Sequence, residues 1–307
     1  MNISIVIPVY NGESSIVGLF DELRKHLKER LFQVVLVNDC SPDNSHQVCL
    51  SLQKDNPEII TYVELARNFG EHSAVLAGLH QVKGDCAIIM DDDFQNPPHT
   101  VLSLVNKMEA SEADVVYSYY QKKKHHWFRN LGSQFNDFVA CALLKKPKDL
   151  YLSSFKCINR FLIDEIIKYD GPYPYLDGLV LRSTKRIAKV QVDHADRGEG
   201  ESGYTLKKLV RLWLNMFINF SVLPLRMCTY LGLVINLGAL VFSLITFYEK
   251  SVNPSMPLGW ASLMIAVMLF SGVQLLMLGL IGEYVGSLFM TINKTPQFIV
   301  RQSWDKN

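Results

Sequence analysis

The stretch ISIVIPVYNGE, residues 3–13, joins a short continuous apolar run to a polar loop. A run of this kind is typical of a β-strand buried on both faces. Similar runs occupy residues 32–38, 59–65, 86–91 and 114–119. Stretches with helical spacing separate most of them, for example residues 14–28 and 44–53. The alternation predicts an α/β domain whose sheet is mainly parallel, with right-handed crossovers.

Ligands of such sheets bind at the carboxyl ends of the strands. The loops there are VYNGE (residues 9–13), DCSPD (39–43), RNFGEH (67–72) and DDDFQNPP (91–98), and they contain most of the polar chemistry of the first half of the chain. We therefore expect the functional site on these four loops.

Three adjacent aspartates, Asp91, Asp92 and Asp93, give the strongest local signal. Their charges repel one another, which favours a bound cation. In an extended segment the side chains of Asp91 and Asp93 point the same way, and two carboxylates suit a hard ion that also binds substrate phosphates. The alternative is an acidic turn that caps the next helix. Asp39 likewise has two interpretations, a hydrogen bond to a nucleoside or an Asx-turn.

The character of the chain changes after residue 205. Residues 206–226 are mixed apolar and basic, which predicts a juxtamembrane amphipathic helix. Residues 227–248 and 258–282 contain no charged side chain. About 20 apolar residues are enough to cross a bilayer, so both segments are predicted to be transmembrane helices. The interpretation as two buried core helices is disfavoured by their length and by the short loop between them.

Basic residues predict the orientation of these helices. Lys207, Lys208, Arg211 and Arg226 precede the first span, and Lys294 and Arg301 follow the second. The positive-inside rule places the domain at 1–205 and the tail at 283–307 in the cytoplasm. The sequence thus predicts a multi-pass protein of the cytoplasmic (inner) membrane, with the lipid bilayer as a partner.

Composition excludes some alternatives. The net charge is +1 over 307 residues, whereas a nucleic-acid-binding domain is usually strongly basic. The six cysteines form no CxxC pair and no zinc-ligand spacing, which favours a reducing compartment. No nucleic-acid partner and no structural zinc are expected.

The segments VIPVYNGE, LVNDCSPDNS, LARNFGEHSAVLAG and MDDDFQNPP resemble the opening motifs of glycosyltransferase family 2, which has the GT-A (Rossmann-like) fold. More narrowly, the chain resembles the polyprenyl-phosphate glycosyltransferases, which include dolichol-phosphate mannose synthases, bactoprenol glucosyltransferases and undecaprenyl-phosphate formamido-arabinose transferases. The resemblance covers nearly the whole chain. It implies an inverting enzyme that moves a sugar from a nucleotide-sugar, with a UDP-sugar favoured, to polyprenyl phosphate for cell-envelope glycan modification.

The resemblance also implies roles for individual residues. Asp91, Asp93 and Gln95 would bind Mg²⁺ or Mn²⁺, and Asp93, Arg129, Ser133 and Arg197 would form the catalytic group, the last three beside phosphates. The nucleotide-sugar would contact Pro8, Tyr10, Asn11, Glu13, Asp39, Arg67, Asp91 and Asp92. An anionic acceptor needs no general base. The resemblance leaves homo-oligomer formation open.

Four positions depart from the pattern of these relatives. Tyr120 stands where an arginine is usual, Ser154 and Lys156 belong to a segment that resembles Gly-Asp-Phe-Arg, and Gly203 replaces a lysine. These departures keep one alternative open, a catalytically impaired membrane adaptor with the same fold. A second alternative, which does not depend on them, is a processive polysaccharide synthase. The second is disfavoured by the small number of spans and by the lack of a QxxRW-like motif.

Overall fold

The computed structural model describes residues 1–119, 146–147, 150–192, 223–252 and 259–305. The chain forms two compact units, one made of residues 1–205 with 294–307 and the other of residues 206–293. Each unit is described by itself below.

The first unit contains an eight-stranded sheet in the order β7-β5-β6-β4-β1-β2-β3-β8. Its strands are β1 (Ile3–Val9), β2 (Leu31–Asn38), β3 (Ile60–Leu65), β4 (Cys86–Ile89), β5 (Val115–Tyr119), β6 (Lys156–Asn159), β7 (Ile187–Gln191) and β8 (Val300–Trp304). The pairs β4-β1, β1-β2, β2-β3 and β5-β7 are parallel. Strand β6 is antiparallel to β4 and β5, and β8 is antiparallel to β3. The predicted α/β fold is confirmed, but the sheet is mixed.

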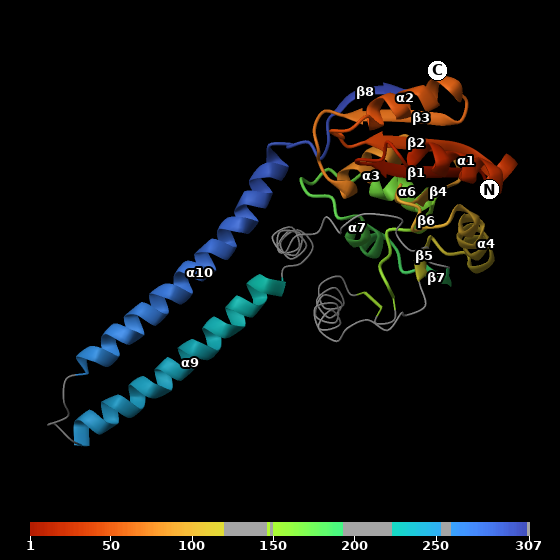
Figure 1. Ribbon diagram of the computed structural model, residues 1–307. Helices are drawn as coiled ribbons and strands as arrows, with labels where there is room; N and C mark the ends of the chain where they lie inside the picture. The colour runs from red at the N-terminus through yellow and green to blue at the C-terminus, as the bar shows by residue number, and fades with distance from the viewer. Residues whose placement is uncertain (120–145, 148–149, 193–222, 253–258, 306–307) are drawn as a thin grey trace. The chain divides into compact units, whose positions relative to one another are not determined.

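Helices connect and cover these strands (Figure 1). They are α1 (Ile16–Leu27), α2 (Ser45–Asp55), α3 (Glu71–Leu79), α4 (Val101–Ser111), α6 (Arg160–Ile166) and α7 (Leu176–Ser183), with short 3₁₀ turns η1 (Lys28–Arg30) and η2 (Pro98–Thr100). The helices expected at 14–28 and 44–53 correspond to α1 and α2.

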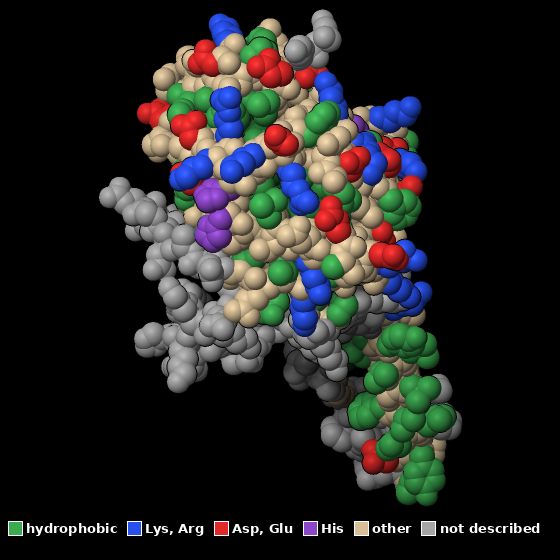
Figure 2. Space-filling model, turned by 90° about the vertical axis from the view of Figure 1, so that its right-hand side faces the viewer, with side chains coloured by type: hydrophobic (Ala, Val, Ile, Leu, Met, Phe, Trp, Pro, Cys, Tyr) green, Lys and Arg blue, Asp and Glu red, His purple; other side chains and the backbone are tan. Residues whose placement is uncertain are grey.

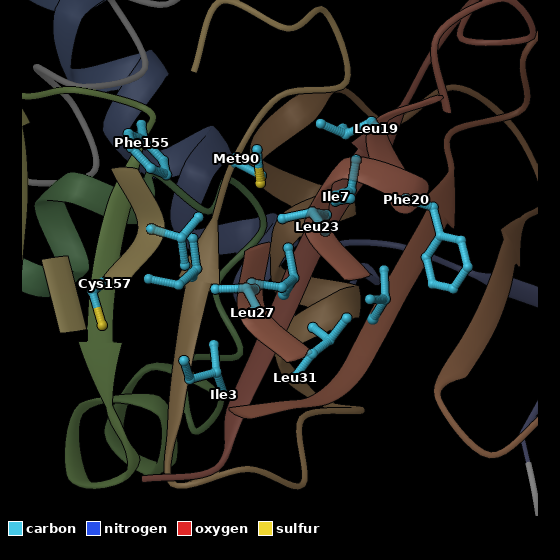
Figure 3. Packing of buried hydrophobic residues seen from close by; sticks show 14 of the residues in the cluster. Ile3, Ile7, Leu19, Phe20, Leu23, Leu27, Leu31, Met90, Phe155 and Cys157 are labelled. Carbon is cyan, nitrogen blue, oxygen red and sulfur yellow. The ribbon is translucent and has the colours of Figure 1, made fainter. Parts of the chain in front are cut away.

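Helix α1 shows why the sequence folds this way. Its buried residues recur at intervals of three and four, so that one stripe of the helix faces the sheet: Ile16, Leu19, Phe20, Leu23 and Leu27. The stripe packs in one core cluster with the alternate residues Ile3, Ile5 and Ile7 of β1 (Figure 3). Burying each such side chain contributes about 1.5–3 kcal/mol, which holds α1 on the sheet directly after the first loop.

Helix α3 lies on the opposite face and requires a glycine. A Cβ atom at Gly78 would come within 2.5 Å of Val6 Cγ1 and 3.0 Å of Val37 Cγ2. Only glycine permits this close approach of the helix to β1 and β2. The close packing fixes the position of the first residue of α3, Glu71, at the carboxyl edge of the sheet.

Strand β8 comes from the end of the chain and lies beside β3 (Figure 1). The ring of Trp304 stacks on that of Tyr62, with centroids 4.9 Å apart and planes at 14°. The Asp305 carboxylate accepts a hydrogen bond from Thr61 Oγ1 at 3.1 Å and pairs with Lys83 Nζ at 2.5 Å. The segment 283–307, predicted as a tail, therefore contributes an edge strand.

The second unit contains two long helices, α9 (Leu223–Val252) and α10 (Trp260–Ile292). Among the described residues, one helical stretch, 270–292 of α10, is long and apolar enough to cross a membrane. Helix α10 thus continues past Gly282, the predicted end of the second span. On the face in Figure 2, charged side chains are interspersed over the α/β unit. The described side chains of the long helices in the second unit are almost all hydrophobic on this face. A second transmembrane helix stays a prediction.

Candidate functional site

Four loops follow the carboxyl ends of strands β1 to β4, as the sequence predicted. Three of them contain a residue other than glycine in the left-handed region: Asn11 (φ 61°), Cys40 (φ 54°) and Phe94 (φ 59°). Such conformations are unfavourable for ordinary side chains and concentrate at functional sites. The Phe94 ring packs against α1, where a Cβ atom at Gly18 would lie 3.3 Å from Phe94 Cζ.

The first and second loops are tied together by hydrogen bonds. Asn11 N donates to Ser41 Oγ at 3.3 Å and Gly12 N donates to Ser45 Oγ at 2.9 Å. Glu13 Oε2 accepts from Asn44 N at 2.7 Å. Glu13, predicted to contact the nucleotide, therefore also satisfies a backbone amide at the start of α2.

Asp39 connects the second loop to the third. Its carboxylate is buried and accepts hydrogen bonds from Phe69 N at 2.7 Å and Gly70 N at 2.8 Å. Burial raises the pKa of Asp39, and these two amides oppose that rise. Gly70 has φ 92°, a conformation that favours glycine. Asp39 thus positions the backbone of the third loop, in addition to the nucleoside contact that the sequence predicted for it.

Three further predicted residues lie in these loops or directly beside them. Tyr10 is exposed, and the exposed Arg67 guanidinium lies 4.5 Å from the centre of the Phe69 ring. Pro8 lies beyond Val6–Ile89, the last β1–β4 register pair. A proline is tolerated there because no hydrogen bond to β4 is lost.

The three aspartates of the fourth loop have different surroundings. Asp91 Oδ2 accepts a hydrogen bond from Ser154 Oγ at 2.8 Å, and Asp93 Oδ1 accepts one from Gln95 N at 3.1 Å. Asp92 Oδ2 is buried and has no hydrogen-bond partner among the described residues. It lies so close to the first loop that a Cβ atom at Gly12 would come within 2.3 Å of it.

Negative charge accumulates at this edge of the sheet. Burial, followed by the charges of Asp91 and Asp93, raises the pKa of Asp92 to about 7. Glu71, at the start of α3, is exposed, yet desolvation by the surrounding protein and then the Asp91 charge raise its pKa to about 7. A divalent cation would relieve this repulsion.

The available donors fit such a cation. Carboxylate and amide oxygens from Asp91, Asp93 and Gln95 are ligands that Mg²⁺ and Mn²⁺ accept. Within the described part of the chain, no group of three His, Cys, Asp or Glu side chains is arranged to hold a metal ion. The remaining coordination positions of a metal held by these residues would be open to water and to oxygen atoms of the substrate.

The remaining predicted residues are Arg129, Ser133 and Arg197. They lie outside the described residues, as do Tyr120 and Gly203. Two features of the site are not predicted from the sequence: the raised pKa of Glu71 and the contact of Ser154 with Asp91. In the sequence, Ser154 stands out only as a departure from a family pattern, and Glu71 only as part of a loop.

Comparison with known families and proteins adds independent findings. The family model described as Glycosyl transferase family 2 matches residues 4–167, and the model described as the GtrB C-terminal hairpin matches residues 223–288. Undecaprenyl-phosphate 4-deoxy-4-formamido-L-arabinose transferase of Serratia proteamaculans is 29% identical over 304 residues, covering 98% of this chain and 93% of the relative. Uncharacterized glycosyltransferase YkcC of Bacillus subtilis is 29% identical over 305 residues, covering 98% and 94%.

A solved structure shares the fold of the first unit. Glucosyl-3-phosphoglycerate synthase of Mycobacterium tuberculosis, crystallised with Mn²⁺ and uridine-diphosphate-glucose, superposes with a TM-score of 0.52 at 18% identity. The match covers 72% of this chain and 79% of that one. At this identity the likeness establishes the GT-A-like α/β fold.

Proposed function

Since the chain belongs to glycosyl transferase family 2 and is a glycosyltransferase, we propose that it transfers a sugar from a UDP-sugar to polyprenyl phosphate at the cytoplasmic membrane. The observation that carries the proposal is the convergence of four loops in mutual contact, with the cluster Asp91–Asp93, at one edge of the sheet. The product would be a membrane-bound polyprenyl-phosphate sugar for modification of cell-envelope glycans.

The donor would bind across the loops after β1, β2 and β3. The Mycobacterium tuberculosis enzyme of the same fold binds uridine-diphosphate-glucose with Mn²⁺, which supports a UDP-sugar here. Asn11, Glu13 and Asp39 are held by hydrogen bonds between the loops. Such preorganisation lowers the entropy cost of holding the donor.

Asp91 and Asp93, with Gln95, would hold a Mg²⁺ or Mn²⁺ ion against the donor diphosphate. When bound, the ion would offset the charge that develops on the leaving nucleoside diphosphate. Asp92, between them in the sequence, lies against Gly12 and so brings the fourth loop into contact with the first.

Polyprenyl phosphate is the acceptor favoured by the name of the Serratia relative and by the match to the GtrB hairpin. A phosphate oxygen is already anionic, so it can attack the anomeric carbon without a general base, and attack from the face opposite the leaving group inverts that centre. We assign Arg129, Ser133 and Arg197 to the phosphates, because arginine binds phosphate oxygens in a bidentate manner.

The pairing of β3 with β8 supports a membrane hairpin. Residues 1–205 and 294–307 belong to one folded unit, which must lie on one side of any bilayer. The chain between them must therefore cross the bilayer an even number of times. If α10 crosses, a second segment must cross as well, and α9, which spans Leu223–Val252, is long enough. The basic residues on both sides of the hairpin favour a cytoplasmic location for the folded unit.

A transfer assay with membranes that contain the protein tests this proposal. They would be incubated with undecaprenyl phosphate and a panel of radiolabelled UDP- and GDP-sugars, and label in the organic phase would be measured. We expect label from one UDP-sugar, its loss on chelation with EDTA, and its loss in the Asp91→Ala/Asp93→Ala variant by a factor of about 100 or more.

Asp55→Ala is the matched control, because it removes an exposed carboxylate at the C-terminal end of α2, the end away from the loop that precedes this helix. It should label as the parent does. Absence of lipid-phase label with every donor would reject the acceptor assignment. Label that survives both chelation and the double substitution would reject the metal assignment.

A further inference from the structure

Ser154 lies across from Asp91 at the carboxyl edge of the sheet. Strands β4 and β6 are antiparallel, with Ile89 opposite Lys156. Continuing this register by two residues brings Asp91 opposite Ser154. The contact is direct, because Ser154 Oγ donates a hydrogen bond to Asp91 Oδ2 at 2.8 Å.

The residue before Ser154 is fixed in the core. Ser153 is buried, and its hydroxyl accepts hydrogen bonds from Ser118 Oγ at 2.9 Å and from Phe155 N at 3.2 Å. These contacts join Ser153 to β5 and to Phe155. They hold the backbone on one side of Ser154 without touching Asp91.

The residue two positions after Ser154 is also anchored. Lys156 is buried and forms an ion pair with Asp177 of α7, and Tyr117 Oη donates to the same carboxylate at 2.9 Å. The Lys156 ammonium lies 5.1 Å from the centre of the Tyr117 ring. A buried ion pair of this kind fixes the strand, since either partner alone would be an uncompensated charge.

Ser154 itself is only partly buried, so its side chain is not needed to fill the core. A hydroxyl suits the contact with Asp91. It restrains the carboxylate through a charge-assisted hydrogen bond and adds no negative charge to a region already crowded with Asp92, Asp93 and Glu71. Because the residues on both sides of Ser154 are anchored, its hydroxyl can hold the Asp91 carboxylate in one orientation.

We propose that Ser154 is a positioning residue for Asp91: it holds the carboxylate in the orientation that binds the divalent cation and the donor diphosphate. The inference rests on the proposed function, because it assigns Asp91 to that cation. It goes further by assigning a separate role in metal affinity to a residue outside the aspartate cluster.

Isothermal titration of the full-length protein in detergent with UDP, at a series of Mn²⁺ concentrations, tests the proposal. We expect Ser154→Ala to weaken Mn²⁺-dependent UDP binding about tenfold, as for loss of one hydrogen bond to a charged group. Its melting temperature should stay close to that of the parent, because the hydroxyl is not part of the core. Ser154→Thr keeps the hydroxyl and should restore binding.

Ser153→Ala is the matched control. It removes the neighbouring serine hydroxyl, which bonds within the core, and should lower the melting temperature. The loss of Mn²⁺-dependent UDP binding should be smaller than in Ser154→Ala, because the ion pair of Lys156 with Asp177 still anchors the strand that follows. The inference fails if Ser154→Ala binds as the parent does, if Ser154→Thr does not restore binding, or if Ser153→Ala causes the same loss. A parent protein that binds no UDP with Mn²⁺ rejects the proposed donor itself, and the inference falls with it.

Discussion

The two units of this protein use the same apolar residue types in opposite ways. Leu36 of β2 is completely buried, whereas Leu276 of α10 is 77% exposed. The α/β unit covers its leucines and valines with its own helices. The described helices of the second unit leave theirs on the surface, including Leu231, Val234, Phe242 and Leu275.

This difference agrees with the proposal that the second unit lies in a membrane. Apolar surface is unfavourable in water, and soluble proteins rarely expose large continuous patches of it. A folded core removes that surface in the first unit. In the second unit the hydrocarbon of a bilayer would serve the same purpose, which agrees with the proposed acceptor at the membrane.

The largest effect is expected for Asp177→Ala. This substitution tests whether the stability of the α/β unit depends on the ion pair buried in its core. The substitution leaves Lys156 buried without its partner and should lower the free energy of unfolding by about 3–5 kcal/mol. Thermal or urea denaturation followed by circular dichroism measures this. The matched change Asp170→Ala, at an exposed aspartate, should be nearly neutral. An unchanged stability of Asp177→Ala would show that the buried pair is dispensable.

Leu276→Arg tests the second unit in the same way. An arginine within a lipid-facing helix costs about 3 kcal/mol, so we expect less protein in the membrane fraction after carbonate extraction. Phe32→Arg is the comparison, because Phe32 is an exposed hydrophobic residue of the α/β unit. It should not alter membrane retention. Equal membrane retention of the two variants would show that the exposed apolar residues of the second unit are no more important for membrane binding than those of the α/β unit.

Trp304→Ala tests whether the end of the chain belongs to the α/β unit. Loss of the stack on Tyr62 and of the edge contact with His46 should destabilise that unit by about 1–2 kcal/mol. The measurement is the midpoint of thermal unfolding. Tyr151→Ala, at an aromatic residue that is 60% exposed, should have little effect. A neutral Trp304→Ala would mean that β8 adds no stability to the sheet.

The smallest effect concerns pH. The folded state raises the pKa of Asp92 to about 7, so between pH 4 and 7 it binds more protons than the unfolded state. The free energy of unfolding should therefore fall as pH rises through this window in the absence of divalent metal. We expect about 1 kcal/mol or less, since solvent screens a partly exposed group. Urea denaturation at several pH values should show that Asp92→Asn reduces this slope and that Asp21→Asn does not.

Much of the α/β unit could be predicted from the sequence, because its signals are local. Continuous apolar runs located β1 to β5, and helical spacing located α1 and α2. Strand β8 was missed, since the short exposed segment at 300–304 has no buried face of its own. Its strand conformation depends on pairing with β3, which lies more than 200 residues earlier in the chain.

The candidate site was predicted less completely. The sequence located the four loops because turn residues and carboxylates follow directly after the strands. It could not show that Asp39 holds the third loop through Phe69 and Gly70, or that Ser154 bonds to Asp91. Both contacts join residues that are 30 or more positions apart, and only the register of the strands brings them together.

The sequence by itself determined the order of apolar and polar segments, and with it the parallel arrangement of β1 to β4, the edge where the carboxylates gather and the apolar character of residues 270–292. Periodicity and hydrophobicity are properties of neighbouring residues and can be read without coordinates. The tertiary structure decided which partner each carboxylate has. The Oδ2 atom of Asp92 is buried beside Gly12, Asp91 accepts a hydrogen bond from a serine that precedes an antiparallel strand, and β8 pairs with β3 at the edge of the sheet. These outcomes depend on which distant segments pack together.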